Sequence, residues 1–213
     1  MTGLPFPRFL LTASLGLLAA VGLSSCGSDS LLTYGKDDHN KMIVSVSDQK
    51  LLLVRDGTPV KSYKISTSKF GVGDRPNSNC TPLGRMQIAK KIGGNAPSGS
   101  VFKNRRPTGE VIKPDAPGRD PVVTRIMWLT GTESRNQNAF RRTIYIHGTP
   151  EERRLGSPAS FGCIRMGSKD VADLYNRVGT GADVFVIRGS IQTKTSGSAT
   201  AMNAKSGGFP HDS

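Results

Sequence analysis

Two side chains that together could perform acyl transfer stand close together in the second half of the sequence. His147 directly follows the apolar run "RTIYI", and Cys163 comes sixteen residues later within "SFGCIRM". A cysteine thiol is mostly protonated at neutral pH, and it becomes a strong nucleophile when a nearby imidazole takes its proton. An unpaired cysteine is also commonly a small, buried apolar residue. The spacing alone leaves both interpretations of Cys163 open.

The neighbours of both residues suit catalysis. A histidine just after a buried strand is held by the sheet, yet it faces a loop, and catalytic side chains are often presented in this way. Gly162 precedes the cysteine, so the backbone can turn tightly there, and its N–H groups can point at a bound oxygen. The pair therefore predicts a nucleophilic site where loops meet the end of a strand.

Several strands must position this site. Residues 41–67 contain short β-rich runs that are divided by Ser47-Asp48 and by Asp56-Gly57, a strong hairpin signal. Further strands are expected in "GRMQIAKKI", "PVVTRIMWL", "RTIYIHG" and "ADVFVIRG", which are rich in apolar residues. Residues 93–121 contain many Gly, Pro and Asn, so the sequence predicts long loops there.

One helix is expected, over about residues 168–178. Ser168 is its predicted N-cap, and Gly179 supplies a stop signal. Its apolar residues recur at helical spacing and form one face: Val171, Leu174, Tyr175 and Val178. The folded unit, residues 41–189, is thus predicted to be mainly β, a sandwich or a partly closed barrel with one clear α-helix.

The N-terminus has the pattern of an export signal. The apolar run from Phe9 to Leu23 is short for a membrane span and typical of a signal peptide. The run ends in "LSSC", which resembles the bacterial lipobox and implies that Cys26 carries lipid after residues 1–25 are removed. A short membrane anchor and an ordinary signal peptide are the alternatives.

The lipobox resemblance sets the expected location. Residues 26–40 are interpreted as a tether, and residues 190–213, rich in Ser, Gly, Ala and Thr, as a disordered tail. We expect an exported protein, anchored by lipid on the periplasmic side of a bacterial membrane. No Asp follows Cys26 directly, which favours the outer membrane in a cell that has one.

Composition narrows the classes of partner. The formal net charge is +13, but the basic residues are scattered and not interleaved with aromatic residues, so nucleic acid is not the expected partner. An anionic cell wall or membrane surface fits better, and a charge that serves solubility alone is the alternative. The three histidines lack metal-ligand spacing, and too few cysteines are present for a disulfide scaffold.

Three segments resemble one known family. "YIHGTPEERRLGSPASFGCIRMGSKDVADLYNRVGTGADVFV" is similar to the signature segment of the L,D-transpeptidase catalytic domain, the YkuD-like family, and "CTPLGRMQIAKKIG" and "TRIMWLTGTE" resemble its upstream strands. The resemblance spans roughly residues 41–189. It implies a β-sandwich-like domain that attacks a peptide bond after a diamino acid in a peptidoglycan stem peptide. No metal or other cofactor is implied.

The resemblance assigns roles to four residues. It makes Cys163 the nucleophile and His147 the general base, with the backbone carbonyl of Gly148 orienting the imidazole. The N–H groups of Gly162 and Cys163 are the implied oxyanion donors. An amine of a second stem would then accept the acyl group, with His147 helping to remove its proton.

Three nearby polar residues have two interpretations each. Arg165 could grip a stem carboxylate or pin the local loop. Ser160 could hold the cysteine loop or occupy a plain turn. Arg142, with its neighbour Arg141, could belong to a substrate lid, but a solvated basic rim is the expectation.

Phe161 departs from the family pattern, in which a second histidine precedes the Gly-Cys pair. A phenylalanine has no proton to give, so this position in the substrate site could make the enzyme slower or differently selective. A hydrolase that uses the same Cys-His pair and a non-catalytic wall-binding lipoprotein remain as alternatives to a transpeptidase. Cys80 matches no catalytic position, and a buried thiol is expected there.

Overall fold

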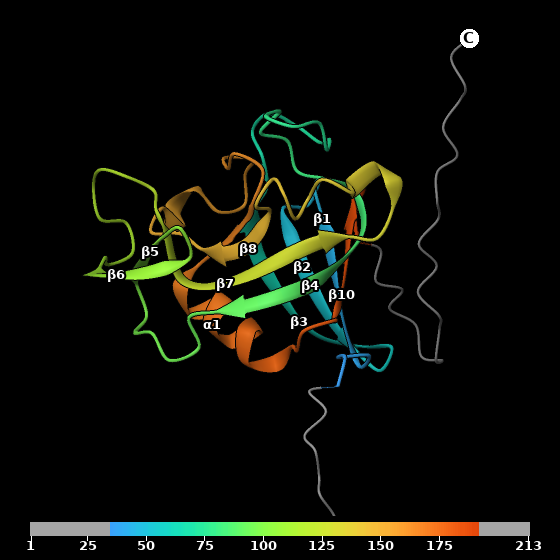
Figure 1. The fold of residues 1–213 in the computed structure, drawn as a ribbon, viewed down its shortest axis with the longest axis horizontal. Helices are drawn as coiled ribbons and strands as arrows, with labels where there is room; N and C mark the ends of the chain where they lie inside the picture. Colours follow the sequence, from blue (N-terminus) through green and yellow to red (C-terminus); the bar gives the residue numbers. More distant parts are fainter. Residues whose placement is uncertain (1–34, 192–213) are drawn as a thin grey trace, which may run out of the picture. The chain divides into compact units, whose positions relative to one another are not determined.

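The computed structural model describes residues 35–191. Ten strands form one sheet: β1 (Asn40–Ser45), β2 (Lys50–Arg55), β3 (Thr58–Ser66), β4 (Gly84–Ile92), β5 (Ser100–Lys103), β6 (Arg106–Val111), β7 (Val122–Gly131), β8 (Tyr145–Gly148), β9 (Ile164–Met166) and β10 (Asp183–Ile187). One α-helix, α1 (Ser168–Arg177), and two short 3-10 turns, η1 (Ser134–Asn136) and η2 (Glu152–Arg154), complete it (Figure 1).

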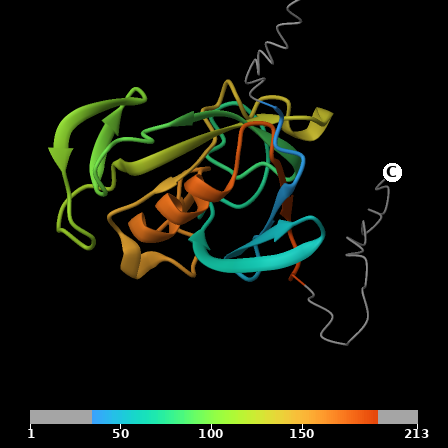
Figure 2. The ribbon, with the colours of Figure 1, turned by 90° about the horizontal axis from the view of Figure 1, so that it is seen from below.

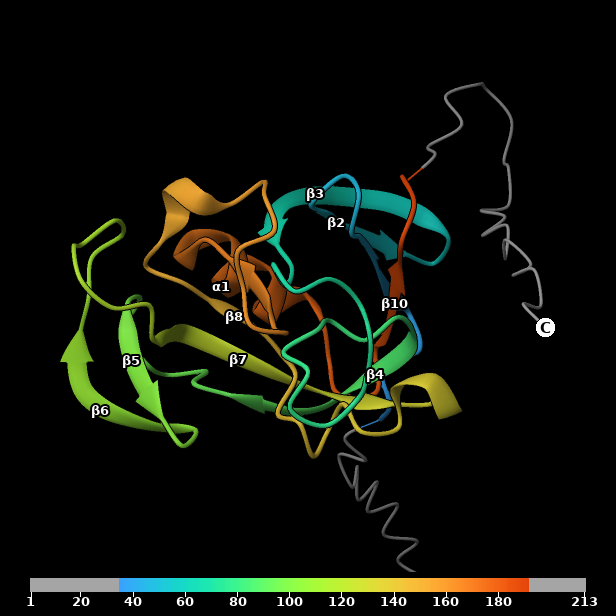
Figure 3. The same cartoon turned by 90° about the horizontal axis from the view of Figure 1, so that it is seen from above.

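The sheet closes into a barrel. Eight strands follow each other in the order β4-β10-β1-β2-β3-β9-β8-β7, and β7 then pairs with β4. Two pairs of adjacent strands, β1–β10 and β8–β9, are parallel, and the other pairs of adjacent strands are antiparallel. The β5–β6 hairpin extends the sheet from β7 and projects to one side of the barrel (Figure 3). The predicted class, mainly β with one helix, is confirmed, and the barrel is closed.

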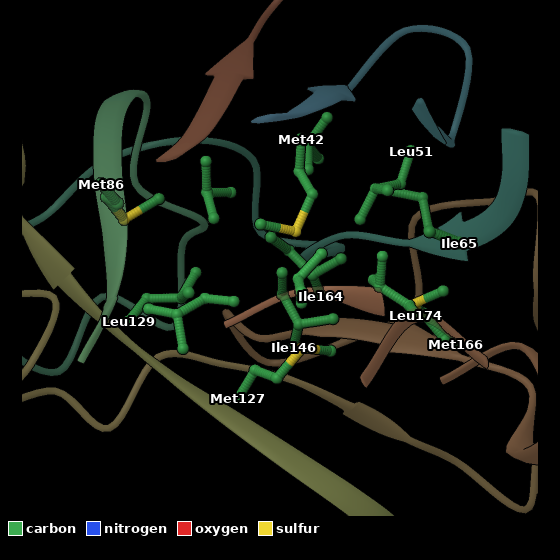
Figure 4. Packing of buried hydrophobic residues seen from close by; sticks show 14 of the residues in the cluster. Met42, Leu51, Ile65, Met86, Met127, Leu129, Ile146, Ile164, Met166 and Leu174 are labelled. Carbon is green, nitrogen blue, oxygen red and sulfur yellow. The ribbon is translucent and has the colours of Figure 1, made fainter. Parts of the chain in front are cut away.

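Apolar side chains fill the barrel. Successive residues of a strand point to opposite faces, so the inward positions of each strand share one core. Ten side chains of this cluster are labelled in Figure 4: Met42, Leu51, Ile65, Met86, Met127, Leu129, Ile146, Ile164, Met166 and Leu174. Burying an aliphatic side chain of this size contributes about 1.5–3 kcal/mol. Ile146 and Ile164 anchor β8 and β9 through this core.

The helix packs against β7 and β8, and Figure 2 shows it lying across the barrel. Its predicted apolar face is confirmed, because Val171, Leu174 and Val178 are buried and Tyr175 packs beside them. The predicted N-cap is wrong. Gly167 is the N-cap, and Ser168 is the first helical residue, with its N–H on Glu152 Oε1 (2.8 Å). A carboxylate from elsewhere in the chain thus replaces the expected serine cap.

The hairpin expectations are partly confirmed. Asp56 and Gly57 both have positive φ and join antiparallel β2 and β3. The expectation of long loops over residues 93–121 is wrong in its middle part, because β5 and β6 form a further hairpin there. Every residue of β6 is exposed, so no apolar alternation marks it. Its turn residues, Asn104 and Arg105, also lack the usual Asn-Gly signal.

The N-terminal signal, Cys26 and residues 192–213 lie outside the described residues. The fold begins before the expected boundary at residue 41. The Asp37 N–H donates to the Thr180 carbonyl (2.8 Å), and the Asp37 carboxylate accepts from the Gly179 N–H (2.6 Å). No helix within residues 35–191 is long and apolar enough to cross a membrane.

Candidate active site

His147 is fixed by its own strand. It is buried near the end of β8, and its Nδ1 lies 2.8 Å from the carbonyl oxygen of Gly148. A carbonyl only accepts, so Nδ1 carries the proton and Nε2 is left as the acceptor. Gly148 has no room for a side chain, because a Cβ there would lie 2.6 Å from the Val123 carbonyl oxygen on β7. The close approach of β7 and β8 therefore requires glycine.

Cys163 lies immediately before β9 and is half-buried. Its sulfur receives the Tyr145 N–H at 3.4 Å and donates to the carbonyl oxygen of Thr143, also at 3.4 Å. Thr143 has φ of 55°, a left-handed conformation that is costly for a β-branched residue. The thiol therefore donates its hydrogen bond to the carbonyl of a residue with a strained backbone.

The sheet register brings the two side chains to one face. β8 and β9 are parallel, with Ile146 opposite Ile164, and both isoleucines point into the barrel core. Cys163 precedes Ile164, and His147 follows Ile146, so both point outward. Arg165 lies opposite His147 on the neighbouring strand, and Cys163 comes two residues before Arg165. This offset places the Cα atoms of His147 and Cys163 about 8 Å apart. Side chains at that separation on one face can meet.

Burial shifts both titrating groups toward their neutral forms. It raises the pKa of the Cys163 thiol to about 11, which the Tyr145 N–H and nearby Arg142 only partly oppose. Burial also lowers the pKa of His147, and the bond to the Gly148 carbonyl opposes that shift. The site therefore rests as a neutral thiol beside a neutral imidazole, which is ready to accept a proton.

The cysteine loop is held by two hydroxyl groups. Ser160 Oγ donates to the Cys163 carbonyl oxygen (2.6 Å) and accepts from the Gly162 N–H (3.2 Å). Thr81 Oγ1 donates to the Gly162 carbonyl oxygen (3.0 Å) and accepts from the Ser68 N–H (3.0 Å). The Gly162 N–H is thus occupied by Ser160, contrary to the expectation of a free oxyanion donor. The carbonyl held by Thr81 belongs to the same peptide plane as the Cys163 N–H.

Gly162 must be a glycine for two reasons. Its φ is +118°, which a residue with a side chain rarely adopts, and a Cβ there would lie 3.2 Å from the Cys80 carbonyl oxygen. The glycine lets the cysteine loop pass close to residues 79–81.

Arg165 lies opposite His147 in the register but is buried, with 3% of its side chain exposed. Its Nη1 binds Asp120 and, at 3.0 Å, Glu151. Asp120 also accepts from the Thr149 hydroxyl. Arg165 is thus buried and joins β9 to two loops, those that contain Asp120 and Glu151.

Arg142 is not part of a solvated rim, so that expectation is wrong. Its side chain is 8% exposed and donates to Asp74 (2.8 Å) and to the carbonyl oxygen of Cys80 (2.7 Å). Arg141 next to it is exposed, as expected. The buried partner Asp74 explains the difference, since a paired guanidinium can be buried where a lone one cannot. Arg142 ties the loop of residues 70–80 to the segment before β8.

Phe161 points to solvent with 62% exposure, and its ring contacts that of Phe70 (centroids 5.4 Å apart). The Lys69 ammonium lies over the Phe161 ring at 4.4 Å. These residues form an exposed group, in which Phe161 lies two positions before Cys163. Cys80 is half-buried and free, and its Sγ lies 3.1 Å from the Phe70 carbonyl oxygen.

A cleft of about 270 Å³ adjoins the cysteine. Thr143 and Tyr145, which both contact the Cys163 sulfur, form one wall. Phe102 and Ile126 add apolar surface to the lining. The pairing of β5 with β7 places the turn of the β5–β6 hairpin beside this opening. Within residues 35–191, no group of three or more His, Cys, Asp or Glu residues is placed to hold a metal ion.

A cysteine and a carbonyl-oriented histidine on one outer face of a β-barrel are the two groups that acyl transfer by a cysteine requires. The model of the L,D-transpeptidase catalytic domain (YkuD) family matches residues 39–187. The chain belongs to this family. No curated protein matches it in sequence.

Solved structures of L,D-transpeptidases are similar to this chain at low sequence identity. An L,D-transpeptidase of Mycobacterium tuberculosis is 21% identical, with a TM-score of 0.46 over 70% of this chain and 61% of that one. An Enterococcus faecium enzyme is 16% identical, with a TM-score of 0.45 over 71% and 50%. A third, in complex with imipenem, is 18% identical, with a TM-score of 0.45 over 70% and 59%. The matched region therefore spans about three fifths or less of these chains.

Proposed function

We propose that the protein is a peptidoglycan L,D-transpeptidase that uses Cys163 as nucleophile and His147 as base. The observation that carries the proposal is the fixed tautomer of His147. Its Nδ1 proton is held by the Gly148 carbonyl, so the free Nε2 faces outward on the side that carries the thiol. Membership of the family supplies the class of substrate, a stem peptide with a diamino acid.

The first half-reaction forms a thioester. The sulfur of Cys163 attacks the carbonyl carbon of the diamino acid, at the peptide bond that follows this residue, and His147 Nε2 takes the thiol proton. The peptide C–N bond then breaks, and the imidazolium returns that proton to the leaving amine. In the second half-reaction an acceptor amine attacks the thioester and gives a proton to His147. The C–S bond breaks, and the thiolate regains that proton as the new amide leaves.

The Cys163 N–H is our proposed donor to the oxyanion of both tetrahedral intermediates. Thr81 holds the carbonyl of the same peptide plane, and N–H and C=O point in opposite directions across a trans peptide. The donor is therefore oriented before the charge develops, which is the condition for effective stabilisation of a transition state.

For location, we propose an exported lipoprotein anchored through Cys26. The signal-like apolar run and the "LSSC" sequence support export and lipid attachment. A net charge of +13 suits a domain that works against an anionic wall. Labelling with a radioactive fatty acid tests the anchor, since Cys26→Ala should lose the label.

The activity is tested by incubating the full chain with disaccharide stem peptides and measuring the products by mass spectrometry. We expect a cross-linked dimer or an exchanged terminal residue, and we expect Cys163→Ala to abolish both. Cys80→Ala is the matched control and should retain activity. A trimmed monomer as the sole product would establish a hydrolase instead, and no product at all would refute both enzymatic functions.

A further inference from the structure

The cleft beside Cys163 has one charged lining residue, Arg105. This arginine stands in the turn of the β5–β6 hairpin, forty residues before Tyr145, whose hydroxyl it contacts. The rest of the lining is apolar or uncharged. A cleft with apolar walls and a single cation complements a ligand that has an aliphatic chain and one negative group.

The guanidinium of Arg105 is held on a rigid aromatic surface. Its central carbon lies 4.8 Å from the centre of the Trp128 ring, and its Nη1 donates to the Tyr145 hydroxyl at 3.3 Å. Trp128 is itself fixed, since it stacks on Phe140 at 4.1 Å and donates its Nε1–H to the Phe140 carbonyl oxygen. Within residues 35–191, Nε and Nη2 of Arg105 donate to no other group. A positioned guanidinium therefore keeps donors available for a ligand.

The backbone at Arg105 is unfavourable for arginine. Asn104 and Arg105 have φ of 51° and 66°, the geometry of a two-residue hairpin turn in which glycine is preferred at the second position. A left-handed conformation disfavours any residue that has a Cβ. The turn would be more stable with glycine, so the arginine side chain must serve a purpose other than forming the turn.

We propose that Arg105 determines substrate specificity by binding a carboxylate on the residue that donates the acyl group. The planar fork of the guanidinium matches a carboxylate, and stacking on Trp128 restricts its orientation. The backbone N–H of Tyr145 contacts the Cys163 sulfur, and the hydroxyl of the same residue contacts Arg105. A carboxylate bound to Arg105 is therefore separated from Cys163 by the length of the Tyr145 residue. The inference rests on the proposed function and specifies the charge that its substrate carries.

The experiment compares two matched stem peptides with the full chain. One carries a free carboxylate on the side chain of the diamino acid, and the other carries the primary amide in its place. Hydrogen bonds to a charged group contribute about 1.5–3 kcal/mol, so kcat/KM should be about tenfold or more higher for the acid. Arg105→Gln should remove this preference by lowering kcat/KM for the acid alone. Arg105→Lys should retain part of it.

Two variants separate specificity from structure and from general charge. Arg105→Gly relieves the turn, so its melting temperature should equal or exceed that of the parent while its preference is lost. A purely structural arginine would give the opposite result. Arg106→Gln removes the same charge from the neighbouring residue, which does not line the cleft, and should keep the preference.

Binding to the Cys163→Ala protein, measured by calorimetry, tests the inference without catalysis. We expect the acid peptide to bind about tenfold more tightly than the amide, and Arg105→Gln in this background to equalise them. If neither peptide is turned over by the parent but this difference in affinity holds, the proposed activity fails and the specificity stands. Equal affinities, or the same loss in Arg106→Gln, would overturn the inference.

Discussion

The thiol of Cys163 should be protonated in the free protein, with its S–H donated to the Thr143 carbonyl oxygen and no proton transferred to His147. Burial raises the thiol pKa to about 11 from an ordinary 9.0, and burial lowers the imidazole pKa. Both shifts oppose a thiolate–imidazolium pair. The perturbation that tests this is His147→Gln, because glutamine can still donate to the Gly148 carbonyl but cannot carry a positive charge.

The magnitude follows from the pKa of Cys163. A rise of about two units leaves about 100-fold less thiolate below pH 9 than an ordinary cysteine has. Alkylation needs the thiolate, so its rate at Cys163 should rise about tenfold per pH unit between pH 6 and pH 9, with no plateau. Because the raised pKa is due to burial and not to His147, the His147→Gln profile should be the same.

The assay is alkylation by iodoacetamide, quenched at intervals and quantified on the digested Cys163 peptide by mass spectrometry. Cys80 is labelled in the same samples and serves as an internal reference for the reagent. A plateau between pH 5 and pH 7 that disappears in His147→Gln would refute the reasoning, since it would show a thiolate stabilised by an imidazolium.

Three further predictions concern residues around the pair. Thr81→Val should lower the rate of product formation from stem peptides about fivefold to tenfold, because the Gly162 carbonyl loses its hydroxyl donor, whereas Thr81→Ser should retain the rate. Arg165→Met should destabilise the fold by about 3 kcal/mol in urea unfolding, because it removes the buried guanidinium that binds both Asp120 and Glu151; Arg153→Met, at an ion pair whose arginine is 78% exposed, should change it by less than about 1 kcal/mol. The lowered pKa of His147 should move the acid limb of the kcat/KM profile below the pH at which an ordinary histidine titrates, and an acid limb above that pH would contradict it.

The strands that carry strong apolar runs were predictable from sequence, as was the single helix. β7, β8 and β10 all lie where β-branched and aromatic residues gather. The β5–β6 hairpin was not predictable in this way, because its outer strand is fully exposed and has no apolar face. β9 is three residues long and is a strand only because β3 and β8 lie on either side of it.

For the candidate site, the sequence identifies residue types but not their contacts. Residue types and spacing indicate the Cys163–His147 pair, and the family resemblance adds the role of each residue and the orienting carbonyl of Gly148. It does not reveal that Arg142 is buried, since the partner Asp74 lies 68 positions away. The contact of the Thr143 carbonyl with Cys163 was also not predictable, because no residue pattern in the sequence indicates the strained φ of Thr143.

The pairing of β1 with β10 joins the first strand of the described fold to its last. β10 also separates β1 from β4, so the barrel stays open until the final strand is in place. Contacts between such distant segments form slowly, because a long loop must close before they contribute. A chain that is synthesised from its N-terminus therefore cannot complete its core before residue 187 has left the ribosome. Folding of the barrel therefore follows release of β10, and a truncation before Asp183 should leave an unpaired, aggregation-prone sheet edge.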